Sequence, residues 1–565
     1  MKKMRKKALG LMLAVCLVGG MSPAAGADVR AQEKEEGASG GAQCQEIYEG
    51  SNIGAQDYSN SNFISQLRAK QATSYLTPMP DGGFMRVQAQ AQMDGDGGWH
   101  WVLVEYYDAS RKLQVSETKR VKLDLPRFGG FYAASDAYYI LSGQKNFEEN
   151  ADTEVLRITK YDKGWNRISS EGLKDCNTAE FFTGGCTRME AYGRHLLIHT
   201  SHTMYKKGDG LNHQANATIQ YDMQEGKFTD YFTAASHIGN GYVSHSWNQF
   251  LHMEDGRLIT VDHGDGYPRS IVLVKYPTDV STGKFLSGDD KLYRCHSVDI
   301  MEFPGGTGEI WTGASVGGFE ISDSSYLVAG NSAIRGDERG NTNNVFVAAV
   351  DKGTDEVTTT WLTDYAEGDG STSTPHMVKL SDSRFVVLWS RGERVHYVVV
   401  DGKGNLEASY DMEGSLSDCA PVMAGGKVTW YTWDNEKITF YDMDCSDLSS
   451  CKKTTITAGH PSYEFAGTTD GVATFECSNC GKQKQEAVYT SYRFSLYNKG
   501  ENLEDESDGI NFRRCWVGDK VEFYINAPTP DSGMEVNNEW SIEVSDEGLM
   551  RCTVEVDSLH SDGIR

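Results

Sequence analysis

Hydrophobic and polar residues alternate in short runs along most of the chain, and Ser371–Asp401 is the clearest example. An alternating run from His376 to Leu380 is followed by a turn at 382–384 and by a strongly apolar run from Phe385 to Trp389. A period of two places every second side chain on one face of a β-strand, and Asp, Ser or Gly between two such runs forms a hairpin turn. The pattern therefore predicts consecutive short antiparallel strands.

The same unit recurs along the chain. The hairpin turn is found seven times, at residues 81–83, 135–136, 192–194, 255–257, 323–325, 382–384 and 424–426. The strand that follows each hairpin ends at Asp108, Asp162, Asp222, Tyr276, Asp351, Asp401 or Asp442. An Asp at this position can accept hydrogen bonds from the backbone that follows it and begin a turn. Units of four short strands, about 40–70 residues apart, are typical of propellers. We therefore predict an all-β chain with a seven-bladed β-propeller over residues 48–444.

The N-terminal residues have no such pattern. Basic residues at positions 2–7, an apolar run over 8–21 and the sequence Ala25-Gly26-Ala27 together have the form of a secretory signal peptide, which predicts cleavage after residue 27. Residues 28–47 are charged and small, and we expect a disordered leader there. No later apolar run approaches the roughly 20 residues that a membrane-spanning helix needs. The expected location is therefore outside the cell or at its surface.

The charge balance narrows the range of partners. The chain of 565 residues carries a formal net charge of −26. Binding of nucleic acid requires a concentrated basic face, so we exclude nucleic acid as a partner. The simplest interpretation is an acidic surface that keeps an exported protein soluble. In an exported protein disulfides persist, and Cys176 and Cys186 are close enough in sequence to pair.

The pattern changes after Asp444. Residues 445–486 carry a Cys477-x-x-Cys480-Gly481 turn, which can bring two thiolates to one zinc ion. The other two ligands would be His460 and Cys451, or Cys445 in place of Cys451. Disulfides between Cys477 and Cys480, or between Cys445 and Cys451, are the alternative. The segment resembles the small zinc-ribbon-like modules of Gram-positive surface proteins, which implies a structural zinc ion.

Residues 487–565 contain short alternating strands, with Trp540 between Cys515 and Cys552. They resemble a bacterial immunoglobulin-like β-sandwich, in which such a tryptophan is buried between two sheets. No last strand is recognisable before Arg565, so we expect a domain that is either small or incomplete.

Polar and aromatic residues concentrate in the loops and strand starts of the third and fourth predicted blades. These candidate ligand-binding residues are His199, His202, His213, Asn216, His245, Trp247, Asn248, Asp262, His263, Asp265, Tyr267 and Arg269. Three interpretations and one further alternative remain open. The polar groups could satisfy one another in a tapered channel. They could bind a carbohydrate or another extracellular ligand, with Trp247 or Tyr267 as a stacking platform. A protein-interaction platform without a small-molecule pocket is a further alternative.

The third interpretation is catalysis. A secreted propeller with clustered His, Tyr and Arg resembles some polysaccharide lyases in outline. The resemblance implies that Arg269 neutralises a uronate carboxylate and that Tyr267 or His263 removes the neighbouring proton. His199, His202 and His245 would then be possible ligands of a divalent cation. A lyase or hydrolase is therefore the alternative to a binding protein.

Overall fold

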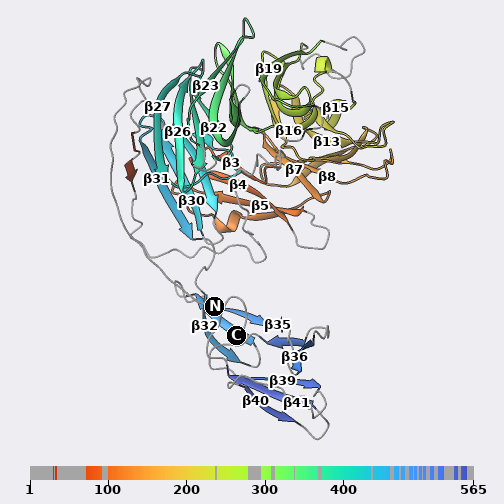
Figure 1. The fold of residues 1–565 in the computed structure, drawn as a ribbon, viewed down its shortest axis with the longest axis vertical. Helices are drawn as coiled ribbons and strands as arrows, with labels where there is room; N and C mark the ends of the chain where they lie inside the picture. Colours follow the sequence, from red (N-terminus) through yellow and green to blue (C-terminus); the bar gives the residue numbers. More distant parts are fainter. Residues whose placement is uncertain are drawn as a thin grey trace, which may run out of the picture. The chain divides into compact units, whose positions relative to one another are not determined.

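The computed structural model describes residues 29–30, 32–34, 71–91, 99–235, 238–277, 294–306, 309, 312–335, 338–366, 369, 372–433 and 437–457, and ten further strands between 463 and 555 (Figure 1). The chain divides into two compact units, one containing strands β1 to β31 and the other β32 to β41. Within the described residues, no helix is long and apolar enough to cross a membrane.

The first unit is a succession of antiparallel sheets. The first sheet contains β3 (Ser74–Pro78), β4 (Phe84–Ala91), β5 (Trp99–Tyr107) and β6 (Lys119–Lys122). The second contains β7 (Arg127–Ala133), β8 (Tyr138–Gly143), β9 (Leu156–Tyr161) and β10 (Arg167–Leu173). Two 3-10 turns, η1 (Val115–Glu117) and η2 (Ile238–Asn240), lie in connections.

The next sheet is the largest and has nine strands along its hydrogen-bonded path and its branches. Its first part contains β11 (Thr178–Phe181), β12 (Arg188–Tyr192), β13 (His195–Met204), β14 (Gln214–Asp222) and β15 (Lys227–Phe232). Its second part contains β16 (Ser244–Glu254), β17 (Arg257–Tyr267), β18 (Ser270–Lys275) and β19 (His296–Glu302). One pair, Ala215 with Ser244, joins the two parts, so each retains its own four-stranded meander.

Three sheets complete the unit. One contains β20 (Ala314–Ile321), β21 (Ser325–Arg335), β22 (Glu338–Asp351) and β23 (Val357–Trp361). The next contains β24 (His376–Ser381), β25 (Arg384–Arg391), β26 (Arg394–Asp401) and β27 (Leu406–Glu413). The last contains β28 (Val422–Ala424), β29 (Lys427–Trp433), β30 (Lys437–Asp444) and β31 (Ser450–Thr457).

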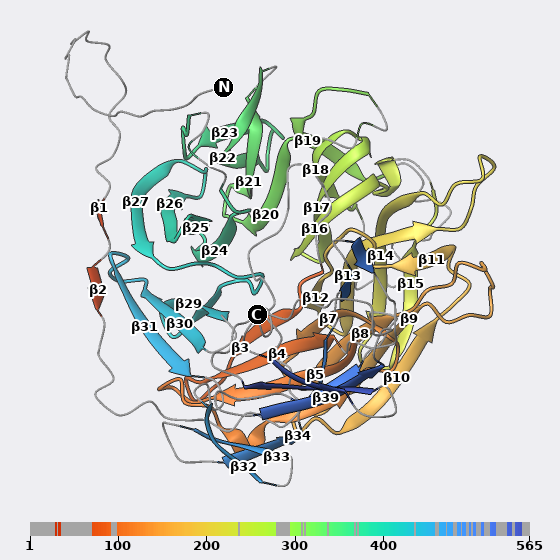
Figure 2. The same ribbon diagram turned by 60° about the horizontal axis from the view of Figure 1, so that its bottom comes forward.

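The sheets stand side by side around a common centre, with β12, β16, β20 and β24 on the inner side (Figure 2). Each of these inner strands packs against the next one, and β28 packs against both β24 and β3. Tyr75 of β3 meets Phe128 and Phe131 of β7 edge-on, with ring centroids 6.0 and 5.8 Å apart. Successive four-stranded antiparallel sheets in this arrangement form a β-propeller. The predictions of a β-propeller and of an almost entirely β chain are confirmed.

Polar contacts join the first and last sheets of the propeller. The Arg111 guanidinium pairs with Asp442 of β30, with Nε 3.2 Å from Oδ2. The Thr73 backbone amide donates to Asp418 Oδ2 over 3.2 Å. These residues are more than 300 positions apart in sequence, so the two ends of the propeller segment are held together by side chains.

The predicted turn function of the strand-terminal Asp residues is confirmed for five of them. One oxygen of Asp162, for example, accepts hydrogen bonds from the amides of Gly164 and Asn166, each over 2.8 Å. Asp108, Asp222, Asp351 and Asp401 do the same. Asp442 does not, because its carboxylate is bound to Arg111, and Asp444 accepts from Ser446 instead.

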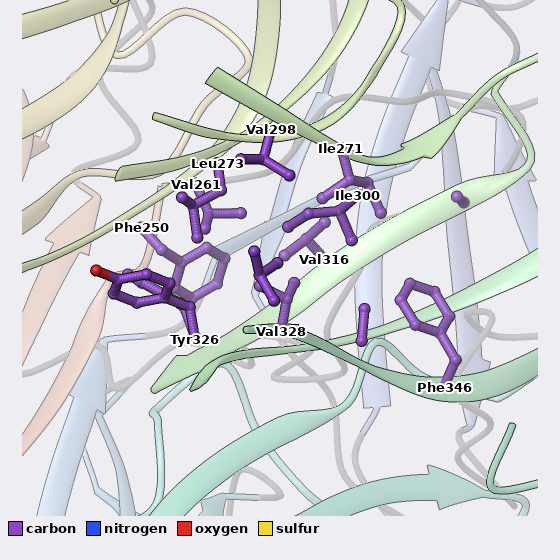
Figure 3. Packing of buried hydrophobic residues seen from close by; sticks show 14 of the residues in the cluster. Phe250, Val261, Ile271, Leu273, Val298, Ile300, Val316, Tyr326, Val328 and Phe346 are labelled. Atoms are coloured by element: carbon purple, nitrogen blue, oxygen red, sulfur yellow. The ribbon is translucent and has the colours of Figure 1, made fainter. Parts of the chain in front are cut away.

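Apolar side chains fill the spaces between neighbouring sheets. One cluster joins the β16–β19 and β20–β23 sheets, where Phe250, Val261, Ile271, Val316 and Val328 pack together (Figure 3). All five are less than a tenth exposed. The alternation seen in the sequence therefore places one face of each strand against the next sheet.

The expectation of a disordered leader over 28–47 is corrected within its first residues. β1 (Val29–Arg30) pairs in parallel with β27, and β2 (Gln32–Lys34) pairs in parallel with β31. An outermost strand has unpaired backbone groups on one side, and an added segment can satisfy them whatever its side chains are. The predicted signal peptide lies outside the described residues.

The boundary predicted at residue 444 also moves. β31 pairs with β30 along its length, with Thr457 opposite Lys437 at one end and Cys451 opposite Met443 at the other. The last propeller sheet therefore continues to Thr457. Its backbone ladder, rather than a hydrophobic pattern, assigns it to this sheet. Cys451 is consequently buried in the propeller core.

The second unit contains smaller sheets. β32 (Tyr463–Thr469), β33 (Val472–Cys477) and β34 (Gln483–Ala487) form a meander, and β39 (Lys520–Asn526), β41 (Leu549–Glu555) and β40 (Trp540–Val544) form a second sheet in that order. Two pairs complete it: β35 (Tyr489–Tyr492) with β38 (Ile510–Arg513), and β36 (Leu496–Asn498) with β37 (Glu501–Leu503).

Candidate functional site

The centre of the predicted site is a buried hydrogen-bond network around Asp262. His199 Nε2 lies 3.0 Å from Asp262 Oδ2, and both side chains are inaccessible to solvent. Ser246 donates its hydroxyl to Asp262 Oδ1 over 2.7 Å, and Asn216 lies 3.4 Å from Oδ2. The second ring nitrogen of His199 is 2.9 Å from the Thr218 hydroxyl. Three donors converge on one buried carboxylate, which is the arrangement that makes a buried acid tolerable.

This network joins β13 and β14 to β16 and β17. Both ring nitrogens of His199 have partners in it, since Nδ1 lies beside the Thr218 hydroxyl and Nε2 beside the Asp262 carboxylate. The Asn216 amide is also held by the backbone, since it donates to the Gly241 carbonyl over 2.8 Å. Neither ring nitrogen of His199 is left to bind a ligand. His199, Asn216 and Asp262 therefore stabilise the contact between two sheets.

Three further predicted residues are buried with their own partners. His202 Nδ1 bonds to the Thr178 hydroxyl over 2.8 Å, and burial lowers its pKa to about 3. His263 Nε2 bonds to the Thr312 hydroxyl over 2.8 Å, and burial lowers its pKa to about 4. Asn248 donates to the Val316 carbonyl. Both histidines are neutral at neutral pH, and His263 is too deeply buried to take a proton from a polysaccharide.

His245 and Asp265 form the part of the predicted site that is accessible. His245 Nδ1 is 2.9 Å from Asp265 Oδ1, the Asp265 side chain is fully buried, and 28% of the His245 side chain is exposed. Asp265 Oδ2 has no hydrogen-bond partner among the described residues. His245 has φ +54°, an unusual backbone conformation for a residue other than glycine. The buried carboxylate holds the imidazole, whose other nitrogen has no partner within the described chain.

Tyr267 is at the end of β17 and pairs with Ser244, the residue before His245, across β16 and β17. It is 49% exposed, which is unusual for a large aromatic side chain in the described part of the propeller. Trp247, the other predicted platform, is only 6% exposed, and its ring lies 5.9 Å from the His245 ring. Tyr267 is therefore the available aromatic platform, whereas the buried Trp247 ring packs against His245.

Arg269 is occupied by backbone carbonyls. Its Nη1 donates to Asp265 O over 2.8 Å and to Glu309 O, and its Nε and Nη2 donate to Pro304 O over 3.2 and 3.1 Å. A guanidinium used in this way closes the loop after β17 and has little capacity left for a substrate carboxylate. This geometry weighs against the predicted lyase chemistry.

The remaining predicted residues do not converge. His213 makes an exposed pair with Asp209, 2.7 Å apart. Within the described chain, no group of three or more His, Cys, Asp or Glu side chains could hold a metal ion. His199, His202 and His245, the predicted ligands of a divalent cation, each have a different partner. His460 and Cys480 lie outside the described residues, as does the Cys477 side chain. Cys176 and Cys186 are both present as thiols, not as the disulfide that the sequence suggested.

A charged cluster on the inner strands was not predicted from the sequence. His252 of β16 lies between two carboxylates: Nδ1 is 2.8 Å from Glu190 of β12, and Nε2 is 3.6 Å from Glu320 of β20. Nε2 also lies 2.9 Å from the Phe319 carbonyl. Burial lowers the pKa of His252, but the hydrogen bond with Glu190 and the charge of Glu320 outweigh it, and the pKa is raised. The sequence feature that could have revealed this cluster is the presence of charged residues within the strands that line the inner side of the propeller.

The chain matches no family model and no curated protein. Solved structures with similar folds include the β-propeller domain of the Trilobed protease from Pyrococcus furiosus, at 9% identity and TM-score 0.33 over 74% of this chain and 96% of that one. Polysaccharide lyase Uly1 is similar at 10% identity and TM-score 0.36 over 73% and 94%. An α-L-arabinofuranosidase from Fusarium graminearum is similar at 11% identity and TM-score 0.33 over 68% and 92%. Similarity this low identifies no function.

Proposed function

We propose that this is an exported or cell-surface protein whose seven-bladed β-propeller binds an extracellular carbohydrate at the end where β16 begins. In this proposal each four-stranded meander is one blade, and the two parts of the nine-stranded sheet count separately. We also propose a structural zinc ion in the segment ending at Cys480 and an immunoglobulin-like domain over residues 487–565. These two modules would act as spacers, stabilised by the metal and by a small core.

The observation that carries the proposal is that an exposed Tyr267 and a partly exposed His245 both lie where β16 begins and β17 ends. A tyrosine ring presents a flat apolar surface for the carbon–hydrogen face of a sugar, and its hydroxyl can bond to water or ligand. His245 offers a ring nitrogen to a sugar hydroxyl, and the buried Asp265 holds it in position. A rigid aromatic group beside an oriented polar group is the usual composition of a binding site.

The experiment is a glycan array on the full-length protein, followed by calorimetric titration of the best ligand. We expect Tyr267→Ala to weaken binding roughly thirtyfold, as truncation of an aromatic residue central to a site does. Tyr267→Phe keeps the ring and should retain most of the affinity. Tyr192 is 36% exposed at the end of β12, so Tyr192→Ala is the matched control and should change nothing.

Two results would overturn the proposal. One is a protein that binds no glycan on the array. The other is a glycan bound equally well by the wild-type protein and Tyr267→Ala, since that would place the site elsewhere.

A further inference from the structure

Arg188 is a partly buried arginine of the propeller that has a fixed position and, within the described residues, no acidic partner. It begins β12, on the inner side of the ring, and is half-buried. Its guanidinium carbon lies 4.5 Å from the centroid of the Phe250 ring. Within the described chain its hydrogen bonds are to the Cys186 sulfur and, over 3.4 Å, to the Thr187 carbonyl. No ion pair joins it to a described carboxylate.

The carboxylates nearest to Arg188 along the chain are already neutralised. Glu180 pairs with Arg127, which belongs to β7. Glu190, two residues further along β12, is bound to His252 and also accepts from the Met253 amide over 3.1 Å. These contacts leave Arg188 as a cation without an anion in a partly desolvated position. A partly desolvated cation is costly unless an anion or solvent compensates it.

Two groups on other sheets that interact electrostatically with Arg188 carry no negative charge at neutral pH. Burial raises the pKa of Tyr75, so its phenol stays protonated. Burial and, to a smaller extent, the charge of Arg188 lower the pKa of His376 to about 4, so this imidazole is neutral at neutral pH. Tyr75 belongs to β3 and His376 to β24, on other sheets of the ring. The field of Arg188 therefore acts across the inner side of several sheets.

The backbone that carries Arg188 is held in place before any ligand arrives. The Cys186 amide donates to Gln249 Oε1 over 2.9 Å, and the Thr187 amide donates to Gln71 Oε1 over 3.0 Å. At Gly185 an added Cβ would lie 2.2 Å from the Ser201 hydroxyl, so the chain approaches that strand as closely as only glycine allows. A ligand would not have to order this segment, which lowers the entropic cost of binding.

We propose that Arg188 binds the oxyanion group, carboxylate or phosphate, of a small ligand that enters the inner side of the ring where β12 begins. A guanidinium presents two parallel N–H groups that match the two oxygens of either group, and stacking on Phe250 fixes the plane of that fork. This site is separate from the Tyr267 surface, and it does not depend on the proposed carbohydrate binding.

The test is calorimetric titration of the full-length protein, at low ionic strength, with D-glucuronate, D-glucose and inorganic phosphate. Glucuronate and glucose differ in the group at carbon six, so the difference isolates the carboxylate. We expect glucuronate or phosphate to bind at least about tenfold more tightly than glucose, and Arg188→Gln to remove about ten- to a hundredfold in affinity. Preference for glucuronate assigns the site to a carboxylate ligand, and preference for phosphate assigns it to a phosphate ligand.

Arg391→Gln is the matched control. Arg391 also lies over an aromatic ring, 3.8 Å from the Tyr365 centroid, but Asp369 is its ionic partner at 4.0 Å. Its substitution should leave anion binding unchanged. Arg188→Lys keeps the charge without the planar fork and should give an intermediate affinity.

Equal affinity for all three probes, or an unchanged affinity in Arg188→Gln, would overturn the proposal. If Arg188→Gln does not fold, Arg188→Lys and the salt dependence of the wild-type protein decide. Binding of an anion to Arg188 must weaken as sodium chloride is added, and a salt-independent affinity would contradict it. Loss of neutral-sugar binding in Tyr267→Ala reports on the other site alone.

Discussion

Two histidine–aspartate pairs of the same sheet differ in their access to solvent. His199 and Asp262 are both inaccessible, and both ring nitrogens of His199 have partners. His245 and Asp265 are nearly the same distance apart, but the imidazole is partly exposed and one of its nitrogens has no described partner. Each pair consists of a histidine and an aspartate, and both aspartates lie on β17.

The two pairs differ in whether they lie inside the sheet or at an end of its strands that solvent can reach. The His199–Asp262 pair spans two four-stranded meanders inside the sheet, where each polar atom must find a protein partner. The His245–Asp265 pair lies where β16 begins and β17 ends, so water or a ligand can replace a protein partner. Residue identity alone therefore does not distinguish a fully buried pair from one that solvent can reach.

The largest expected effect is that of removing the buried acid. Asp262→Ala leaves His199 and Ser246 without an acceptor, and we expect it to lower the free energy of unfolding by about 3–5 kcal/mol. Asp209→Ala breaks the exposed His213 pair and should cost about 0–1 kcal/mol. Chemical denaturation of both variants measures the difference. Equal losses would mean that the interior network contributes no more than a surface pair.

The same substitution at the two histidines should have unequal effects. His199→Gln cannot serve both Thr218 and Asp262 in the same geometry, and we expect it to cost about 1–3 kcal/mol. His245→Gln retains a donor for Asp265 at a partly exposed site, and its cost should stay below about 1 kcal/mol. Sugar affinity should fall in His245→Gln and remain in His199→Gln wherever the latter is folded. A reversed pattern of stability would contradict the assignment.

A third pair, His252 with Glu190, gives the smallest effect and a pH dependence. Its raised pKa means that the folded state favours the charged imidazole. The stabilisation is complete below the unfolded pKa, about 6.5, and is lost as the pH rises through the higher folded value. We expect a loss of about 1 kcal/mol, since the His252 side chain is partly exposed. Denaturation between pH 6 and 9 should show this decline in the wild-type protein and not in His252→Gln. His296→Gln, at an exposed pair with Asp355, is the control and should retain the decline.

Much of the architecture could be predicted because strands have a local signature. The alternation around Phe385 and the Asp401 turn depend on neighbours within a few residues, so the sequence shows them directly. β31 and the two leader strands could not be placed in this way. The two leader strands pair with strands far along the chain, and β31 pairs with β30 just before it. In each case the hydrogen bonds join backbone groups and are independent of side-chain pattern.

The candidate site was predicted in part. The concentration of histidines in the third and fourth units was visible, but its division into buried and exposed members was not. Arg188, Glu190 and His252 were missed because they lie within inner strands, away from the loops in which binding residues were sought. Arg269 was assigned to a ligand, whereas the backbone carbonyls of Asp265 and Pro304 occupy it.

The sequence by itself determined the strand periodicity, the hairpin turns and hence the propeller architecture, because these arise from interactions between residues close together in the chain. Only the tertiary structure decided which polar side chains serve the fold and which remain for a ligand. That division depends on solvent access and on partners more than 40 residues away, such as Asp262 for His199. Burial and pairing are set when sheets pack, and no local pattern encodes them.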